Sequence, residues 1–298
     1  MKKININKMQ KEYDFFNQFQ LNLYSEFGTM IDKLKVYPNF WTTCTLKGQR
    51  NFHSLYSHNY YIEYAKRFKN KRHTALKVLE IGVFQGFSIK LWEEYFSKAD
   101  IYGIDINLKT KHNGITPVEL LKDKKRVHLF EFDATKKENI DKFVEENGGD
   151  FDIIIDDGSH YGEHQILFSL LFKPLLKKDG IMVIEDVGLF YGADYEEYTF
   201  LEYKEDDTKD IEFGNEKKWG MPLFEYFMQN YHKIKNDKEH KLHKIVKTLD
   251  VKVLDEFKQD WIEPINYHIE LDDVNINNDN FINELNGNSK MCFLTYKK

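Results

Sequence analysis

Short apolar runs alternate with amphipathic segments through the middle of this chain, and that alternation constrains the fold more than any other feature. The apolar runs cover 76–81, 101–106, 127–132, 151–155 and 181–184. The segments between them with helical spacing are 87–97, 136–146 and 162–177. Strands buried on both faces are nearly continuous apolar runs, and helices between such strands are typical of parallel connections. The sequence therefore predicts an α/β fold with a doubly wound, mostly parallel sheet.

Helix boundary signals agree with this pattern. Thr135 and Glu138 have the spacing of a capping box at the start of a helix. Gly148 and Gly180 stand where glycines commonly end helices. We therefore expect one helix to begin near Thr135 and two helices to end near these glycines.

The flanks of the chain have a different character. Apolar residues recur at helical spacing in 8–36 and again in 57–69, which predicts an N-terminal helical cap over 1–75. Residues 76–298 then form the main domain, in which 187–262 is an insertion that we expect to act as an acceptor lid. Two strand-like runs, 267–271 and 291–296, predict a C-terminal hairpin.

Composition excludes several functional classes. The 43 Lys and Arg residues against 49 Asp and Glu residues argue against a nucleic-acid partner. No apolar run reaches the about 18 to 20 residues that a membrane helix needs, and the first residues lack the apolar core of a signal peptide. We therefore expect a cytoplasmic protein without a membrane partner. Cys44 and Cys292 lie in no metal-binding pattern, which favours two reduced thiols.

A glycine-rich loop follows the first predicted strand and opens a helix. It runs from Glu80 through Gly82 and Gly86 to Ser88. At such a turn, glycines let backbone amides approach a ligand closely. The spacing is neither that of a dinucleotide fingerprint nor that of a phosphate-binding loop, which disfavours NAD and ATP. Without further support, a simple strand-to-helix turn would explain the two glycines as well.

Two acids supply that support. Asp105 ends the second predicted strand about 20 residues after the glycines, where a carboxylate accepts hydrogen bonds from ribose hydroxyls. Asp133 ends the third strand and is suited to accept from an adenine amino group, although a helix cap is an equal alternative. Together these residues predict a cofactor that contains adenosine.

Four more acids follow the next two predicted strands: Asp156, Asp157, Glu185 and Asp186. Because neighbouring parallel strands end at the same edge of a sheet, we expect these carboxylates to converge. Like charges at close range need a cation, and oxygen ligands favour a hard ion such as Mg²⁺. We therefore predict a metal site at the last three of these acids; helix caps or a solvated rim are the alternative.

His160 lies three residues beyond Asp157, in a turn at the same edge. Its imidazole can take a proton near neutral pH, which makes His160 the candidate general base. The alternative is a helix N-terminal residue that binds backbone. His164, one turn further on, is expected to support the site rather than to react.

At this point the chain resembles the Rossmann-like methyltransferases that use S-adenosylmethionine, since the glycine loop, Asp105 and Asp133 occur in their order. The segments 156–164 and 180–186 resemble, more specifically, the metal-dependent sugar O-methyltransferases of macrolide biosynthesis. The resemblance implies Mg²⁺ on Asp157, Glu185 and Asp186 and a base at His160.

The resemblance adds two residues to the predicted cofactor site, and the chain differs from the family at one segment. Asp156 and Tyr60 are assigned to the cofactor site. Tyr60 is the last residue of the segment 57–60, which resembles an N-terminal element of the family, and the segment 32–33 resembles another. A Thr/Ser-Tyr segment commonly follows the Glu-Asp pair in the family, whereas this chain has 187–192 (VGLFYG), which puts the acceptor in doubt.

These observations predict an Mg²⁺-dependent O-methyltransferase that acts on a hydroxyl of a sugar, a nucleotide sugar or another sugar-containing metabolite. Asp157 is counted with His160 among the catalytic residues because the ion would hold the reacting hydroxyl. A phosphorylated small molecule or a phenolic diol is an alternative acceptor, and a non-catalytic nucleotide-binding protein is the alternative from another class. The N-terminal cap could also support a homo-oligomer.

Overall fold

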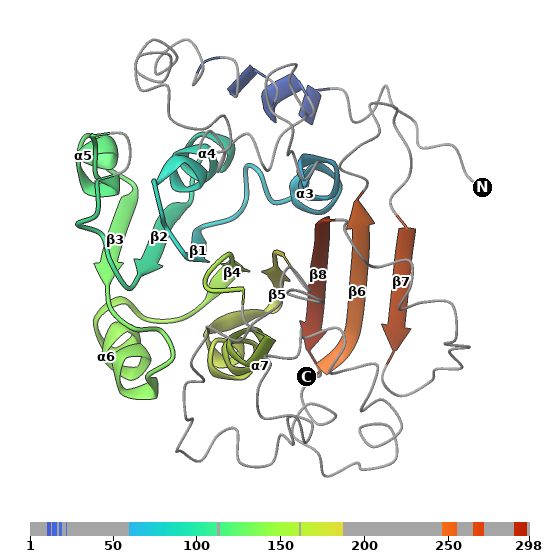
Figure 1. Cartoon of the computed structure of the whole chain (residues 1–298). Coiled ribbons are helices and arrows are strands. Elements are labelled where there is room, and N and C mark those ends of the chain that lie inside the picture. The colour runs from blue at the N-terminus through green and yellow to red at the C-terminus, as the bar shows by residue number, and fades with distance from the viewer. Residues whose placement is uncertain are drawn as a thin grey trace, which may run out of the picture.

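The computed structural model describes residues 60–186 apart from 112, 113 and 161, three strands within 246–296, and several helical residues between 11 and 22. The helices are α3 (Tyr61–Phe68), α4 (Phe87–Tyr95), α5 (Pro117–Leu121), α6 (Lys137–Asn147) and α7 (Gly162–Leu171). The strands are β1 (Lys77–Ile81), β2 (Asp100–Asp105), β3 (Val127–Glu131), β4 (Phe151–Asp156), β5 (Leu176–Ile184), β6 (Val246–Leu254), β7 (Ile265–Glu270) and β8 (Ser289–Tyr296). Figure 1 shows their arrangement.

The described strands form one sheet in the order β3-β2-β1-β4-β5-β8-β6-β7. The first five strands in this order pair in parallel, and β8, β6 and β7 pair antiparallel. Helices α4 and α5 lie on one face of the parallel part, and α6 and α7 lie on the other (Figure 1). The prediction of a doubly wound, Rossmann-like sheet is confirmed. The strand order reverses between β1 and β4, which is where ligands bind in such folds.

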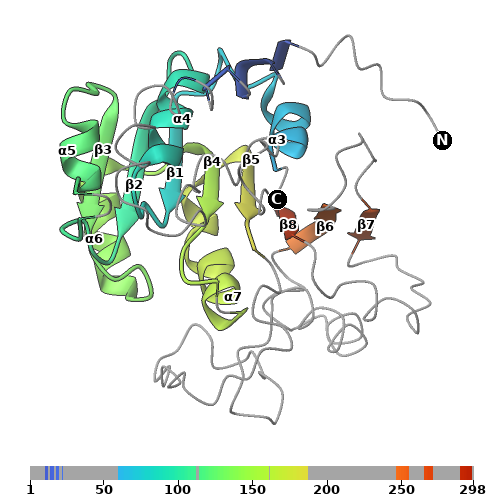
Figure 2. The ribbon, with the colours of Figure 1, turned by 45° about the horizontal axis from the view of Figure 1, so that its top comes forward.

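The C-terminal part differs from the prediction. The two expected strands, at 267–271 and 291–296, do not form a hairpin with each other, because β6 lies between β7 and β8. The hairpin partner of β7 is β6, which belongs to the segment that we assigned to the insertion. Figure 2 shows β8, β6 and β7 continuing the sheet beyond β5. Pairing over this distance depends on tertiary contacts, which local patterns do not contain.

Three boundary predictions were wrong. The helix expected at 162–177 ends at Leu171, a 3-10 turn follows, and Gly180 lies inside β5 rather than after a helix. The Thr135 hydroxyl does not cap α6, because it donates to Asp133 Oδ1 (2.6 Å). The capping box instead starts α5, a short helix that the sequence patterns did not reveal, and it joins Thr116 to Glu119. Gly148 does end α6, with φ +70°.

The core between α3, α4 and the sheet is rich in aromatic rings. Trp92, Tyr64, Phe68 and Phe96 are fully buried there. Phe16, from the helical residues near the N-terminus, packs on Tyr95 of α4 with ring centroids 5.1 Å apart. These contacts agree with an N-terminal cap that covers one face of the sheet, although the division at residues 75 and 76 stays a prediction.

Several further predictions concern residues that the structure does not describe, namely Cys44, 32–33 and 187–245. Cys292 lies in β8. Among the described residues, no helix is long and apolar enough to cross a membrane.

Candidate active site

A cavity of about 590 Å³ opens at the carboxyl ends of the parallel strands. It lies at the reversal of strand order between β1 and β4. Eight predicted site residues line it: Gly82, Ser88, Asp105, Asp133, Asp157, His160, Glu185 and Asp186. The cavity therefore joins the predicted cofactor loop to the predicted metal and base residues.

The glycine loop is built around a close backbone approach. Gly82 has φ +91°, and a Cβ on it would lie 2.0 Å from the carbonyl oxygen of Asp157. Its N–H donates to the carbonyl of Ile104 (2.8 Å), and the N–H of Asp157 donates to the carbonyl of Ile81 (2.8 Å). Only glycine tolerates both this φ and this contact, so Gly82 fixes the distance between the cofactor loop and the turn that carries Asp157.

Asp105 holds the same loop from the neighbouring strand. Its Oδ2 accepts hydrogen bonds from the backbone N–H groups of Val83 (2.7 Å) and Phe84 (2.9 Å). Asp133 accepts from the backbone N–H (2.9 Å) and the hydroxyl of Thr135, in the manner of a local turn cap. Both acids line the cavity. The geometry thus gives each a structural role and leaves each in place to contact a ligand.

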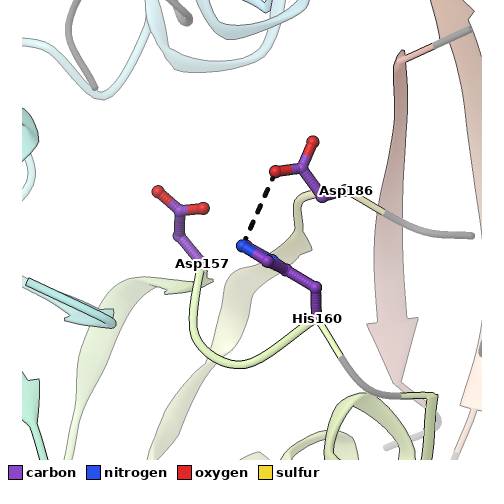
Figure 3. A group of neighbouring side chains, drawn as sticks. All are labelled: Asp157, His160 and Asp186. Atoms are coloured by element: carbon purple, nitrogen blue, oxygen red, sulfur yellow. Dashed lines mark ion pairs between the residues drawn. The ribbon is translucent and has the colours of Figure 1, made fainter. Parts of the chain in front are cut away.

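The acids and His160 gather in two groups that share Asp157. In one group, ligand atoms of Asp157, His160 and Asp186 lie within 4.8 Å of one another; in the other, the group is Asp157, Glu80 and Glu185. Figure 3 shows the first group, in which His160 Nε2 lies 3.8 Å from Asp186 Oδ2. The convergence predicted from the strand ends is therefore present.

The predicted set of Asp157, Glu185 and Asp186 does not form a single group of this size among the described residues. Glu185 and Asp186 are consecutive, so their side chains leave the backbone in different directions. Glu185 is directed inward, where it is 2% exposed. Asp186 has φ +51°, and its side chain meets His160 instead, which itself has φ +62°. Strained backbone of this kind is concentrated at functional sites.

Two tyrosines from α3 reach these acids. The Tyr60 hydroxyl donates to Asp186 Oδ1 (2.5 Å), and the Tyr64 hydroxyl donates to Glu185 Oε1. Burial and the nearby carboxylates raise the pKa of both hydroxyls well above the usual value, so both keep their protons. The helical spacing in 57–69 predicted for Tyr64 only a place on the apolar face of a helix. The four-residue spacing from Tyr60 was the signal that could have linked it to the site.

Four residues of the predicted cofactor set do not line the cavity, namely Glu80, Gly86, Asp156 and Tyr60. Gly86 precedes α4 with φ +85° and meets α5. Tyr60 is fully buried against Asp186, so its contact is with a predicted metal acid rather than with the cavity. Glu80 belongs to the acid group, and a role for it at an ion was not predicted.

Burial perturbs two more titratable groups near the turn at 156–160. It raises the pKa of Asp156 to about 7, and Asp156 Oδ1 accepts from the N–H of Gly158 (3.2 Å). It lowers the pKa of His164 to about 4, so this imidazole is neutral near pH 7. His164 Nδ1 lies 2.5 Å from the Ser159 hydroxyl, an arrangement that agrees with its predicted supporting role.

The donor set fits a hard divalent cation. Carboxylate oxygens dominate both groups, and His160 adds one imidazole nitrogen. Three carboxylates, two of them buried, within 4.8 Å of one another repel unless positive charge or protons neutralise them. Oxygen-rich sites of this type suit Mg²⁺, Mn²⁺ or Ca²⁺.

The comparisons with known proteins agree with this site. Residues 79–187 match the family model described as a methyltransferase domain. The matched segment runs from β1 to just beyond Asp186 and so includes all the cavity residues named above. Over these residues the fold and the site are therefore similar to a methyltransferase domain.

Particular relatives resemble the chain over the same region. It is 33% identical over 136 residues to mycinamicin VI 2''-O-methyltransferase of Micromonospora griseorubida, which covers 43% of this chain and 31% of the relative. It is 34% identical over 140 residues to a tetracenomycin-C 3'-O-methyltransferase of Streptomyces olivaceus, covering 44% and 33%. The chain thus spans about a third of the length of these relatives. The resemblance to sugar O-methyltransferases is confirmed.

A solved structure is also similar. The MycE methyltransferase from the mycinamycin pathway, in complex with Mg, SAH and mycinamycin VI, matches with a TM-score of 0.47 and 20% identity. The match covers 80% of this chain and 50% of that chain.

Proposed function

We propose that this chain is a metal-dependent O-methyltransferase that transfers the methyl group of S-adenosylmethionine to a hydroxyl of a sugar-containing small molecule. One observation carries the proposal: Asp157, Glu185, Asp186 and the imidazole of His160 line the same cavity as Gly82 and Asp105. The predicted cofactor loop and the predicted metal and base residues thus line one cavity. The similarity to sugar O-methyltransferases supports the acceptor class.

The cofactor part of the cavity would hold the adenosine. Asp105 would accept from the ribose hydroxyls and Asp133 from the adenine amino group, and Gly82 lines the same cavity. Asp105 also fixes Val83 and Phe84, so ribose binding and loop order are coupled. Ser88, the second residue of α4, completes the predicted set.

His160 would act as the base. The acceptor oxygen attacks the methyl carbon, the sulfur–carbon bond breaks, and the hydroxyl proton passes to His160. The products are a methyl ether and S-adenosylhomocysteine. Asp186, 3.8 Å from the ring, would stabilise the imidazolium that forms. No covalent enzyme intermediate is required.

Asp157, Glu185 and Asp186 are the residues that would hold the ion. Asp157 belongs to both groups, Glu185 lies in the group with Glu80, and Asp186 lies in the group with His160. When bound, a divalent cation would polarise the acceptor hydroxyl and lower its pKa. These roles, Mg²⁺ as the ion, and the acceptor lid at 187–262 are proposals, as are the cytoplasmic location, the lack of a nucleic-acid partner and a homo-oligomeric state.

The test measures S-adenosylhomocysteine formation with sugar-bearing acceptors, in Mg²⁺ and in EDTA. We expect turnover only with the ion, and unchanged turnover in EDTA would contradict the metal role. A phosphorylated acceptor and a catechol are tried in parallel, and turnover confined to either would reassign the acceptor.

A variant pair tests the base. His160→Asn removes the base while asparagine tolerates φ +62°, and the expected loss in kcat is about 10²- to 10⁴-fold with cofactor affinity retained. His128→Asn is the matched control, because His128 lies on β3 beside Asp100 and does not line the cavity. Full activity in His160→Asn would remove His160 as the base.

A further inference from the structure

Two tyrosine hydroxyls at the start of α3 donate hydrogen bonds to two consecutive acids. Tyr60 precedes α3 and Tyr64 lies within it, four residues apart and therefore on one face. Their partners, Asp186 and Glu185, follow β5. Figure 1 shows α3 on the side of the sheet where α4 lies. Two sequence segments more than 120 residues apart thus meet at the acid groups.

Tyr60 contacts both the side chain and the backbone of Asp186. Its hydroxyl donates to Oδ1 (2.5 Å) and accepts from the Asp186 N–H (3.2 Å). These bonds support a residue whose φ of +51° is costly for a non-glycine residue. They also leave Oδ2 on the side of His160. Tyr60 therefore restricts which oxygen of Asp186 faces the group with Asp157.

Tyr64 restricts the orientation of the Glu185 carboxylate in a similar way, and its ring lies in the core. Its ring is fully buried and lies 4.9 Å from the ring of Trp92 and 5.0 Å from that of Phe68. These ring contacts restrict where the hydroxyl can lie, and it donates to Glu185 Oε1. Glu185 in turn belongs to the group with Glu80 and Asp157. The hydroxyl is a neutral donor within a cluster of carboxylates.

We propose that Tyr60 and Tyr64 are positioning residues, which orient Asp186 and Glu185 and thereby set the affinity of this protein for its divalent cation. The inference rests on the proposed function, since it needs an ion at these acids. Hydrogen-bond partners that orient ligands typically change metal affinity or activity by about 10- to 100-fold when they are removed. A merely structural tyrosine would affect stability but not the ion.

The test compares three variants that each remove one buried hydroxyl. Tyr60→Phe and Tyr64→Phe remove the bonds to the acids. Tyr95→Phe is the matched control, because Tyr95 is also buried and donates to a carboxylate, Glu12 (2.7 Å), away from the cavity. Ion affinity is measured directly, by Mn²⁺ titration followed by electron paramagnetic resonance without cofactor or acceptor. S-adenosylhomocysteine affinity is measured by calorimetry.

We expect Mn²⁺ to bind about 10- to 100-fold more weakly to Tyr60→Phe and to Tyr64→Phe. Tyr95→Phe should match the wild type, and all variants should keep their S-adenosylhomocysteine affinity. Wild-type Mn²⁺ affinity in either α3 variant would overturn the role of that tyrosine while leaving the proposed function intact. If the wild type itself binds no Mn²⁺, the metal role in the proposed function fails and the inference falls with it.

A measurement on the wild type covers the case in which a variant does not fold. Hydrogen exchange of the α3 amides is followed with and without saturating Mg²⁺. Because the tyrosines join α3 to the acids, ion binding should slow exchange in Tyr61–Phe68 as well as around Asp186. Protection around Asp186 with no change in α3 would overturn the proposal.

Discussion

Gly82→Ala should damage the protein more than its small size suggests. The new Cβ would lie 2.0 Å from the carbonyl oxygen and 2.6 Å from the carbonyl carbon of Asp157. Ordinary contact of a Cβ begins at about 3.4 Å, so the loop and the turn would have to move apart by about 1.4 Å to reach it. Backbone lies on both sides of the clash, and no side chain can rotate away to relieve it.

Gly114 is the control that distinguishes the cost of this steric clash from the cost of a positive φ. Gly114 has φ +83°, close to the +91° of Gly82, but a Cβ there would meet no described atom within 4 Å. Both alanine variants lose about 1 to 2 kcal/mol for a positive φ. Alanine also lowers the conformational entropy of the unfolded chain, which offsets that loss by about 0.4 to 1 kcal/mol. Gly82→Ala alone adds the overpacking cost, typically about 1 to 3 kcal/mol.

The assay is urea unfolding of both variants and the wild type, together with titrations of S-adenosylhomocysteine and Mn²⁺. We expect Gly114→Ala to lower the free energy of unfolding by about 1.6 kcal/mol or less. Gly82→Ala should lose about 2 kcal/mol more and should weaken both ligands, since it displaces the cofactor loop and Asp157 together. Equal stability in the two variants, with wild-type ligand affinities, would refute the reasoning.

Two further predictions concern stability alone. Burial lowers the pKa of His164 to about 4, below its unfolded value near 6.5, so the neutral form is favoured by folding. The unfolded chain then binds the extra proton, and the free energy of unfolding should fall by about 3 kcal/mol between pH 6.5 and 4 because of this residue. His164→Asn should show a correspondingly shallower fall in urea titrations across that range, and an identical slope would disprove it. Thr116→Ala removes the capping box with Glu119 and should cost about 1 kcal/mol by thermal or urea unfolding, whereas an unchanged midpoint would show that α5 does not need its cap.

Much of the fold could be predicted because its signals are local. The strand at 151–156 is buried at every position, and its sequence is correspondingly apolar except at Asp152 and at its last residue, Asp156. Boundary errors arose where local signals compete. Gly180 looked like a helix end, yet it lies in β5, within the register shift between Leu176 and Ile181, which pair with Phe151 and Ile153 of β4.

For the site, the sequence by itself determined that acids and a histidine stand at the ends of neighbouring strands. Parallel strands end at one edge, so Asp157, His160 and Asp186 had to come near one another. Only the tertiary structure decided which of these side chains belong to which of the two groups around Asp157. The direction of a side chain depends on backbone angles such as φ +51° at Asp186 and on what packs against it, here Tyr60 and Tyr64 from a distant helix. These contacts follow from how α3 docks on the sheet, and no local pattern around residue 185 encodes them.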